Sequence, residues 1–336
     1  MTFILAFLQS LIYQYLTIRF ENKYNFFVDC HKKLHAIHTT PTPRVGGIGI
    51  FLAFAISMMI LMPQYWWLVA SGAVIFGFGL YEDWHGDTRK EFRLGAMAIG
   101  TYIAIYFGGY VADDSEFFIL PYVVAAAFTI FAVVGTSSAI NFIDGLNGLA
   151  GGLSGTVLIF YGGLAYWYGD FELVSVISIL LGAIGGFFLW NYPKGKIFLG
   201  DGGAYFLGSM LAMIAIILAA RHDEISLWYA CIALLYPVIE TFVTIDRRIN
   251  RKRKYGTPFF EAERVHLHTL KFRRRTKDNA SATRRILLFN FYINLAAVIF
   301  HQSVPMLIIV GVLVYIVYNV KYKKIVRFGY PKKNMV

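Results

Sequence analysis

The chain has 336 residues, of which 57% are hydrophobic and only 15% are charged, and its formal net charge is +11. Soluble domains usually carry about 25% charged residues, so this composition excludes an ordinary soluble enzyme. Apolar runs with almost no charge recur along the whole chain, which indicates an all-α, polytopic integral membrane protein. Eleven spans are predicted, at 2–18, 45–62, 66–81, 94–111, 119–139, 149–168, 173–190, 204–220, 227–244, 286–301 and 304–320.

Lys and Arg lie almost entirely on one side of this predicted topology. The opposite side holds only Arg221, and the other 30 of the 31 Lys and Arg fall in alternate connections and the C-terminal tail. By the positive-inside rule, the N-terminus is predicted to lie outside and the C-terminus in the cytoplasm. The chain is expected to form one transmembrane domain, 1–336, with its largest cytoplasmic segment at 245–285. The positive connections are 19–44, 82–93, 140–148, 191–203, 245–285 and 321–336.

Two basic runs stand out, RRINRKRK at 247–254 and KFRRR at 271–275. Topology and the anionic lipid headgroups of a membrane account for both runs, so nucleic acid is not expected as a partner. A basic surface that attracts an anionic substrate stays an open alternative.

Acidic residues, amides, histidines and glycine pairs collect in five of the cytoplasmic connections. Each connection joins two helices of a bundle, so residues far apart in sequence can converge on one cytoplasmic cleft. Such convergence at one membrane face predicts an active site in the cytoplasmic loops. The five motifs are TTPTPRVGG (39–47), YEDWHGDTRK (81–90), NFIDGLNG (141–148), KIFLGDGG (196–203) and ERVHLHTL (263–270).

Asp201 precedes two glycines and a span that is expected to begin at Ala204. The start of a helix offers free N–H groups to a phosphate, and an adjacent Asp can hold Mg²⁺. The alternative interpretation is that Asp201 only caps the helix.

In NFIDGLNG, Asn141, Asp144 and Asn147 are each three residues apart, which places them on one face if the segment is helical. Their oxygen atoms suit a hard cation or the edge of a nucleobase. Alternatively, these side chains satisfy the backbone of a turn.

The acidic pair Glu82–Asp83 ends a predicted span, and adjacent carboxylates do not share one helix face. Only one of the two is therefore expected to face a shared ligand, and the alternative is a solvated loop paired with Arg89 and Lys90.

His266 and His268, two residues apart, would line one side of an extended segment and could donate to phosphate. The alternative is an exposed surface loop, and zinc lacks a third nearby ligand. Arg44 could bind phosphate through two N–H groups, or simply mark the start of a span.

Taken together and in this order, the motifs resemble those of the polyprenyl-phosphate N-acetylhexosamine-1-phosphate transferase superfamily, of the glycosyltransferase family 4 type. The pairing of NFIDGLNGLAGG (141–152) with FLGDGGAYFLG (198–208) carries most of the resemblance. It implies a multi-pass protein of the bacterial inner membrane that transfers a sugar-1-phosphate from a UDP-N-acetylhexosamine donor to a polyprenyl phosphate acceptor and releases UMP. The implied cofactor is Mg²⁺, for which Mn²⁺ can substitute.

The resemblance also implies roles for individual residues. Asp201 matches the Mg²⁺ ligand, Phe198 an aromatic that stacks on uracil, and Asp83 a residue proposed to activate the lipid phosphate. Asp83, Asp144 and Asp201 are thus the predicted catalytic residues. The predicted substrate-binding residues are Arg44, Asn141, Asn147, Phe198, His266 and His268.

Three positions depart from the usual pattern: Glu82 stands in place of Asp, Asn147 in place of Asp, and Thr269 in place of a third His. These departures favour the branch that initiates surface polysaccharides over the phospho-N-acetylmuramoyl-pentapeptide transferase of peptidoglycan synthesis, which stays the alternative. A transporter of an anionic lipid-linked substrate is the alternative from another class. It is disfavoured because transporters usually place polar residues near the bilayer midplane, often in paired repeats.

Overall fold

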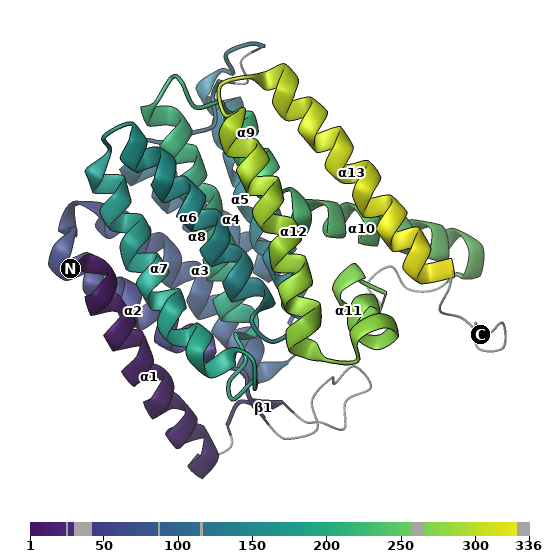
Figure 1. Cartoon of the computed structure of the whole chain (residues 1–336). Coiled ribbons are helices and arrows are strands. Elements are labelled where there is room, and N and C mark those ends of the chain that lie inside the picture. Colours follow the sequence, from purple (N-terminus) through teal and green to yellow (C-terminus); the bar gives the residue numbers. More distant parts are fainter. Residues whose placement is uncertain (25, 30–41, 87, 115–116, 257–264, 328–336) are drawn as a thin grey trace.

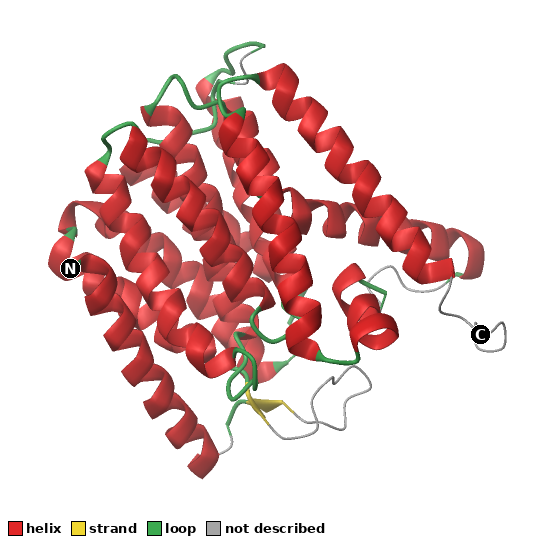
Figure 2. Ribbon diagram, in the orientation of Figure 1, coloured by secondary structure: helices red, strands yellow, loops and turns green. Residues whose placement is uncertain are grey.

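A computed structural model describes the whole chain except residues 25, 30–41, 87, 115–116, 257–264 and 328–336. The described part is a bundle of helices with one two-stranded antiparallel sheet, formed by β1 (Val28–Asp29) and β2 (Thr42–Pro43). Figures 1 and 2 show the sheet at one end of the bundle.

A helix occupies each of the eleven predicted ranges, so the all-helical prediction is confirmed. Most boundaries agree within a few residues. The main differences lie at the ends that were predicted to be cytoplasmic, where polar residues predicted in loops continue a helix. The helices are α1 (Thr2–Tyr24), α2 (Gly46–Leu61), η1 (Pro63–Tyr65), α3 (Trp66–His85), α4 (Lys90–Gly108), α5 (Tyr122–Ile143), α6 (Leu149–Trp167), α7 (Phe171–Asn191), α8 (Gly200–Arg221), α9 (Leu227–Ala233), α10 (Leu235–Tyr255), α11 (Leu267–Lys271), η2 (Phe272–Thr276), α12 (Asn279–Ile299) and α13 (Val304–Arg327).

Within the described residues, seven helices are long and apolar enough to cross a membrane: α1, α5, α6, α7, α8, α12 and α13. An eighth span results if the bent pair α9–α10 is counted as one. The chain is therefore a multi-pass membrane protein, while the count of eleven spans and the orientation stay predictions. At 16 residues, α2 is about 24 Å long, shorter than a hydrocarbon core of about 30 Å.

Helix α8 forms the centre of the bundle. Nearly every residue from Gly202 to Leu218 is buried, and α2, α3, α5, α6 and α9 all pack against it. A helix that is apolar all round is stable only where neighbours cover every face. The central position of α8 matters for function because Asp201 lies in its first turn.

The predicted span 227–244 is wrong as one straight helix. The chain bends by 69° between α9 and α10. Pro237 has no N–H, so it cannot donate to the carbonyl of Ala233, four residues earlier. The side chain of Asn294 in α12 donates to that carbonyl instead, over 3.2 Å. Beyond the bend, α10 runs sideways out of the bundle, as Figure 1 shows.

Candidate active site

The two carboxylates of the acidic pair face different neighbours, as their adjacency on a helix predicts. Asp83, in the last turn of α3, accepts hydrogen bonds from the N–H groups of Asp201 (3.0 Å) and Gly202 (3.1 Å). Glu82 lies 3.5 Å from Arg93 in α4 and accepts a hydrogen bond from the hydroxyl of Tyr205 in α8. Asp83 therefore belongs to the site at the start of α8. Glu82 instead links α3 to α4 and α8 beside that site.

The first turn of α8 differs from the sequence-based hypothesis. The N–H groups that were expected to face a phosphate donate to Asp83, so a protein carboxylate occupies the positive end of this helix dipole. The capping alternative for Asp201 is also wrong, because the N-cap position is Leu199 and no side chain caps the helix. The Asp201 carboxylate points instead at Arg44.

Glycines allow the helix ends at this site to approach one another. A side chain at Gly79 in α3 would collide with the backbone of Gly202, and one at Gly47 in α2 would collide with that of Gly203. Gly200 has a φ of +79°, and a Cβ there would lie 2.7 Å from the Asp83 carboxylate. The glycines of GDGG and PRVGG thus bring α2, α3 and α8 close enough for Asp83 to reach the start of α8.

Arg44 lies near two of the acidic residues. The guanidinium Nη2 of Arg44 lies 3.6 Å from Asp201 Oδ1 and 4.0 Å from Asp83 Oδ1. Burial, followed by the negative charge of Asp201, raises the pKa of Asp83 to about 7, against the opposing effects of Arg44 and the two N–H groups. Asp83 is only 3% exposed and Asp201 is 24% exposed, so Asp201 is the carboxylate that a ligand reaches more easily.

Asp144 adds a third carboxylate from the end of α5. It immediately follows the helix, and its N–H donates to the carbonyl of Asn141. Its half-buried position raises the pKa of Asp144 to about 7, with Arg44 lowering it and Asp201 raising it. Asp83, Asp144, Asp201 and Arg44, which we call the acidic cluster, therefore interact electrostatically although they come from four separate segments.

Phe198 is held next to Arg44 by backbone pairing. Its N–H donates to the carbonyl of Pro43 and its carbonyl accepts from the N–H of Gly46, each over 2.8 Å. The segment before α8 and the segment before α2 thus lie side by side, which brings the backbone of the half-buried Phe198 next to the segment that carries Arg44.

Asn147 lies apart from these carboxylates. Its side chain donates to the carbonyl of Pro193 over 3.0 Å, its N–H donates to the Asn279 side chain, and its carbonyl accepts from Thr283. These contacts fit the alternative in which the amide satisfies loop backbone and joins the loop to α12. The substrate-binding role of Asn147 stays a prediction.

The histidine motif is buried, so the exposed-loop alternative is wrong. His266 precedes α11 and His268 lies within it, and their rings stack with centroids 5.3 Å apart. Burial lowers the pKa of His268 to about 3, so this imidazole is neutral near pH 7. A Cβ at Gly145, next to Asp144, would lie 2.8 Å from His268 Nε2, which places the motif beside the loop of the acidic cluster.

Glu240 in α10 holds the histidine motif and was missed by the sequence analysis. Its carboxylate accepts a hydrogen bond from the N–H of Leu267 (2.9 Å) and lies 3.5 Å from His266 Nδ1. Thr244, one turn later, lies 3.3 Å from the same nitrogen. An acidic residue inside an apolar span is a recognisable signal, because such residues are rare and usually functional.

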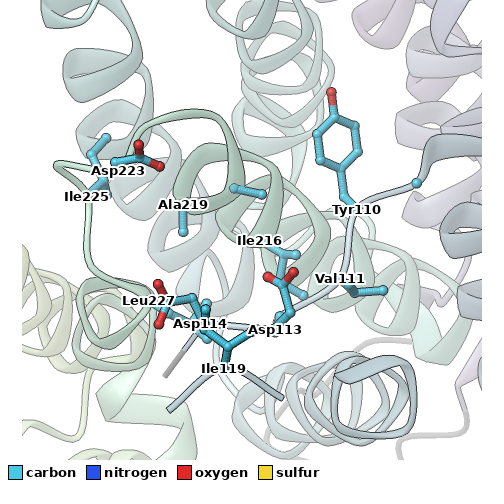
Figure 3. Close-up of a pocket in the computed structure, with 13 residues that line it drawn as sticks. Tyr110, Val111, Asp113, Asp114, Ile119, Ile216, Ala219, Asp223, Ile225 and Leu227 are labelled. Carbon is cyan, nitrogen blue, oxygen red and sulfur yellow. The ribbon is translucent and has the colours of Figure 1, made fainter. Parts of the chain in front are cut away.

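A pocket of about 560 Å³ lies at the opposite end of the bundle, between the α4–α5 and α8–α9 connections. Figure 3 shows Asp113, Asp114 and Asp223 around it, together with Tyr110 and Leu227. The predicted site residues do not line this pocket.

The family model for glycosyl transferase family 4 matches residues 65–219 of the chain. Over this range the chain is similar to the family. The match contains Asp83, Asn141, Asp144 and Asp201, while Arg44 and the histidine motif lie outside the matched range.

Curated relatives extend the family similarity along more of the chain. The decaprenyl-phosphate N-acetylglucosaminephosphotransferase of Mycobacterium leprae is 28% identical over 308 residues, covering 78% of this chain and 73% of the relative. The phospho-N-acetylmuramoyl-pentapeptide-transferase of Listeria welshimeri is 28% identical over 292 residues, covering 80% and 88%. A probable undecaprenyl-phosphate N-acetylglucosaminyl 1-phosphate transferase of Bacillus subtilis is 28% identical over 247 residues, covering 69% and 66%.

Two of these relatives are named as polyprenyl-phosphate transferases and one as a phospho-N-acetylmuramoyl-pentapeptide-transferase, and all three are 28% identical to this chain. Identity alone therefore does not place the chain in one branch of the family.

Proposed function

We propose that this protein transfers an N-acetylhexosamine-1-phosphate from a UDP-sugar to polyprenyl phosphate and releases UMP, as the first membrane step of a surface polysaccharide. The acidic cluster at one end of the helical bundle is the observation that carries the proposal. Similarity to the family and to relatives named as polyprenyl-phosphate transferases supports the same reaction class.

The charge balance of the acidic cluster supports a divalent cation. Among the described residues, the cluster holds three carboxylates and one guanidinium, and two of the three carboxylates have a pKa raised to about 7. Carboxylate oxygens are the ligands that Mg²⁺ prefers. Asp201, which is more exposed than Asp83, would hold Mg²⁺ together with an oxygen of Asp83 or Asp144. Within the described residues no group of three metal-binding side chains is preassembled, so substrate phosphates and water would complete the coordination.

The reaction joins two anions, and repulsion is its main barrier. Two unit charges about 4 Å apart repel by roughly 4 kcal/mol at an effective dielectric near 20. Bound Mg²⁺ would supply positive charge that offsets this repulsion and stabilises the transferring phosphoryl group. Arg44, at 35% exposure, adds a second positive charge from the protein itself.

In the proposed step, an oxygen of the polyprenyl phosphate attacks the phosphorus that carries the sugar. A new phosphorus–oxygen bond forms, the bond from that phosphorus to the bridging oxygen breaks, and UMP leaves with the bridging oxygen. The acceptor phosphate is mostly ionised near pH 7, because its second pKa is about 6, so no strong base is required. Asp83 would then act by positioning and charge rather than by removing a proton.

The remaining predicted residues keep proposed roles in binding. In the proposal, Phe198 would stack on uracil, Asn141 would line the nucleotide site and His266 would donate to the diphosphate. Glu240 and Thr244 face His266 Nδ1, which leaves Nε2 for the ligand.

UMP release from purified full-length protein tests the proposal. The donors are UDP-GlcNAc, UDP-GalNAc, a UDP-6-deoxy-N-acetylhexosamine and UDP-N-acetylmuramoyl-pentapeptide, each with polyprenyl phosphate. Turnover with a simple N-acetylhexosamine that stops with EDTA and returns with Mg²⁺ is expected. Turnover with the pentapeptide donor alone would assign the peptidoglycan reaction, and no UMP with any donor would contradict a transferase.

A further inference from the structure

Four cations gather where α11, η2, α12 and α13 meet, on a part of the protein that the proposed reaction does not use. The ammonium of Lys321 lies 3.9 Å from the centre of the Phe289 ring in α12. Arg285 lies one turn before Phe289, on the same face of that helix. We call the following four residues the basic cluster: Lys271, Arg275, Arg285 and Lys321.

The other two cations come from the segment that follows the histidine motif. Lys271 ends α11 and Arg275 lies four residues later in η2. Arg274 ties this segment to α13, because its Nη1 donates to the carbonyls of Ile325 (3.0 Å) and Val326 (3.2 Å). Figure 1 shows α12 and α13 joined at one end and diverging towards the other, with α11 between their separated ends.

The basic cluster has no acidic counterpart in the described part of the chain. None of its four members forms an ion pair with a carboxylate there, and Lys271 is half-buried. Burial and the positive charges of Lys321, Arg285 and Arg275 lower the pKa of Lys271 to about 8. Like charges held together by four different helical elements cost free energy, which a bound anion would offset.

Apolar surface adjoins the cluster. Leu288 in α12 is 54% exposed, and Val317 and Val320 in α13 are 41% and 60% exposed. In a multi-pass membrane protein such side chains contact acyl chains. A phosphate that is attached to acyl chains therefore fits this surface better than a dissolved phosphate does.

We propose that the basic cluster binds the phosphate headgroup of an anionic phospholipid from the surrounding membrane, with the acyl chains along α12 and α13. Lys271 and His268 belong to the same five-residue helix, so the bound lipid would also hold the histidine motif in place. The inference does not depend on the proposed reaction, because it concerns binding alone.

Native mass spectrometry of the full chain, purified in a neutral detergent, tests the proposal with phosphatidylglycerol and phosphatidylcholine as probes. The double variant K271Q/K321Q removes two charges of the cluster. The matched control K252Q/K254Q removes two exposed charges from α10. Each charge near an anionic headgroup contributes about fivefold in affinity, or about 1 kcal/mol, so K271Q/K321Q should lose about 25-fold for phosphatidylglycerol. The control should stay close to wild type.

Three results would overturn the proposal. They are equal loss in both double variants, no preference for phosphatidylglycerol over phosphatidylcholine, and complete displacement by millimolar inorganic phosphate, which would assign a soluble anion. Selective binding of polyprenyl phosphate alone would also overturn it, by assigning the cluster to the acceptor. If K271Q/K321Q does not fold, the single variant Arg285→Gln, at an exposed position, should still lose about fivefold.

Discussion

The two ends of the helical bundle differ in how completely their arginines are surrounded by protein partners. At the end with the acidic cluster, the guanidinium of Arg44 lies 3.6 to 4.0 Å from two carboxylates and remains 35% exposed. At the other end, Arg221 is enclosed by partners. It makes two hydrogen bonds to Asp170 (3.1 and 3.2 Å), one to Tyr65 (2.7 Å) and one to Tyr110 (2.9 Å).

This difference indicates a structural role for Arg221, while the ligand-binding role of Arg44 stays a prediction. Arg221 has a protein acceptor at each of its nitrogens, and its partners come from η1, the α4–α5 connection and the α6–α7 connection. It therefore joins loops and leaves nothing for a ligand. Within the described residues, the acidic cluster holds three carboxylates and one guanidinium, and an excess of negative charge costs stability unless a cation binds there. Of two charged regions in one protein, the unbalanced one is the better candidate for chemistry.

The sharpest test of the comparison removes one carboxylate at each end. Asp201→Asn and Asp144→Asn should each reduce UMP release by about a thousandfold or more, because several kcal/mol of charge stabilisation is lost. Asp223→Asn, in the pocket at the other end, is the matched control and should leave turnover unchanged. Purified Asp201→Asn that turns over at the wild-type rate would contradict the proposed site.

A smaller loss is expected at Glu240. Removal of this carboxylate leaves the N–H of Leu267 and the ring of His266 without their partner. If the lost interaction raises the activation free energy by about 1.5–3 kcal/mol, Glu240→Ala should lower kcat about 10- to 100-fold. Glu240→Gln keeps an acceptor for the N–H and should recover part of the activity. Equal activity of all three proteins would show that the motif does not need this support.

Raising the pH should lower the stability of the end that holds the acidic cluster and raise the rate of turnover. In the folded chain the pKa of Asp83 and Asp144 lies near 7, above the value of about 4 for an exposed Asp. Folding therefore favours the protonated forms, and this contribution to stability is complete below about pH 4 and is lost as pH rises through 7. Turnover requires ionised carboxylates and should rise from pH 6 to 8, by about tenfold for each of the two groups that must be ionised.

Thermal unfolding without divalent ions, followed from pH 5 to 8, measures the first of these effects. Asp144→Asn should flatten the decline in unfolding temperature. The same slope in variant and wild type would show that Asp144 is not the titrating group.

At the opposite end, Arg221→Met should change stability and not catalysis. It leaves Asp170, whose side chain is 9% exposed, without its cation, which costs about 1–3 kcal/mol. Thermal unfolding measures the loss, and kcat per folded molecule should stay at the wild-type value. A fall in kcat without a fall in unfolding temperature would reverse the roles assigned to the two ends.

The smallest effect is expected at Asn147. Asn147→Asp loses the donor to the Pro193 carbonyl, so it should lower stability by about 1 kcal/mol. Its effect on KM for the donor should be less than about threefold if it only holds the loop. A larger rise in KM, with unchanged unfolding temperature, would instead support the predicted substrate-binding role.

Much of the fold could be predicted from the sequence because apolar runs have few ways to exist in a membrane. Each run becomes a helix, since only helices satisfy the backbone groups there within one segment. The bend at Leu234 escaped prediction because Pro237 within an apolar run does not reveal whether a neighbour such as Asn294 will satisfy the freed carbonyl.

For the site, residue type and position at helix ends indicated Asp83, Asp144 and Asp201, but not how they share Arg44. Glu240 could have been noticed as a carboxylate in an apolar run, yet its contact with His266 joins residues 26 apart across two elements. Asn147 looked equivalent to Asn141 by spacing, and its hydrogen bonds to segments near 193 and 279 are invisible in sequence.

The sequence by itself determined that the chain lies in a membrane, where its helices form and which residue types stand at the helix ends. Hydrophobicity and local spacing, which decide these features, are properties of short segments. The tertiary structure decided which of those residues meet. It directed Asp83 to the start of α8 and Glu82 to Arg93, and it buried His268 beside Gly145. These contacts depend on how closely the helices approach one another. Glycines at the helix contacts set that distance, and no single segment encodes it alone.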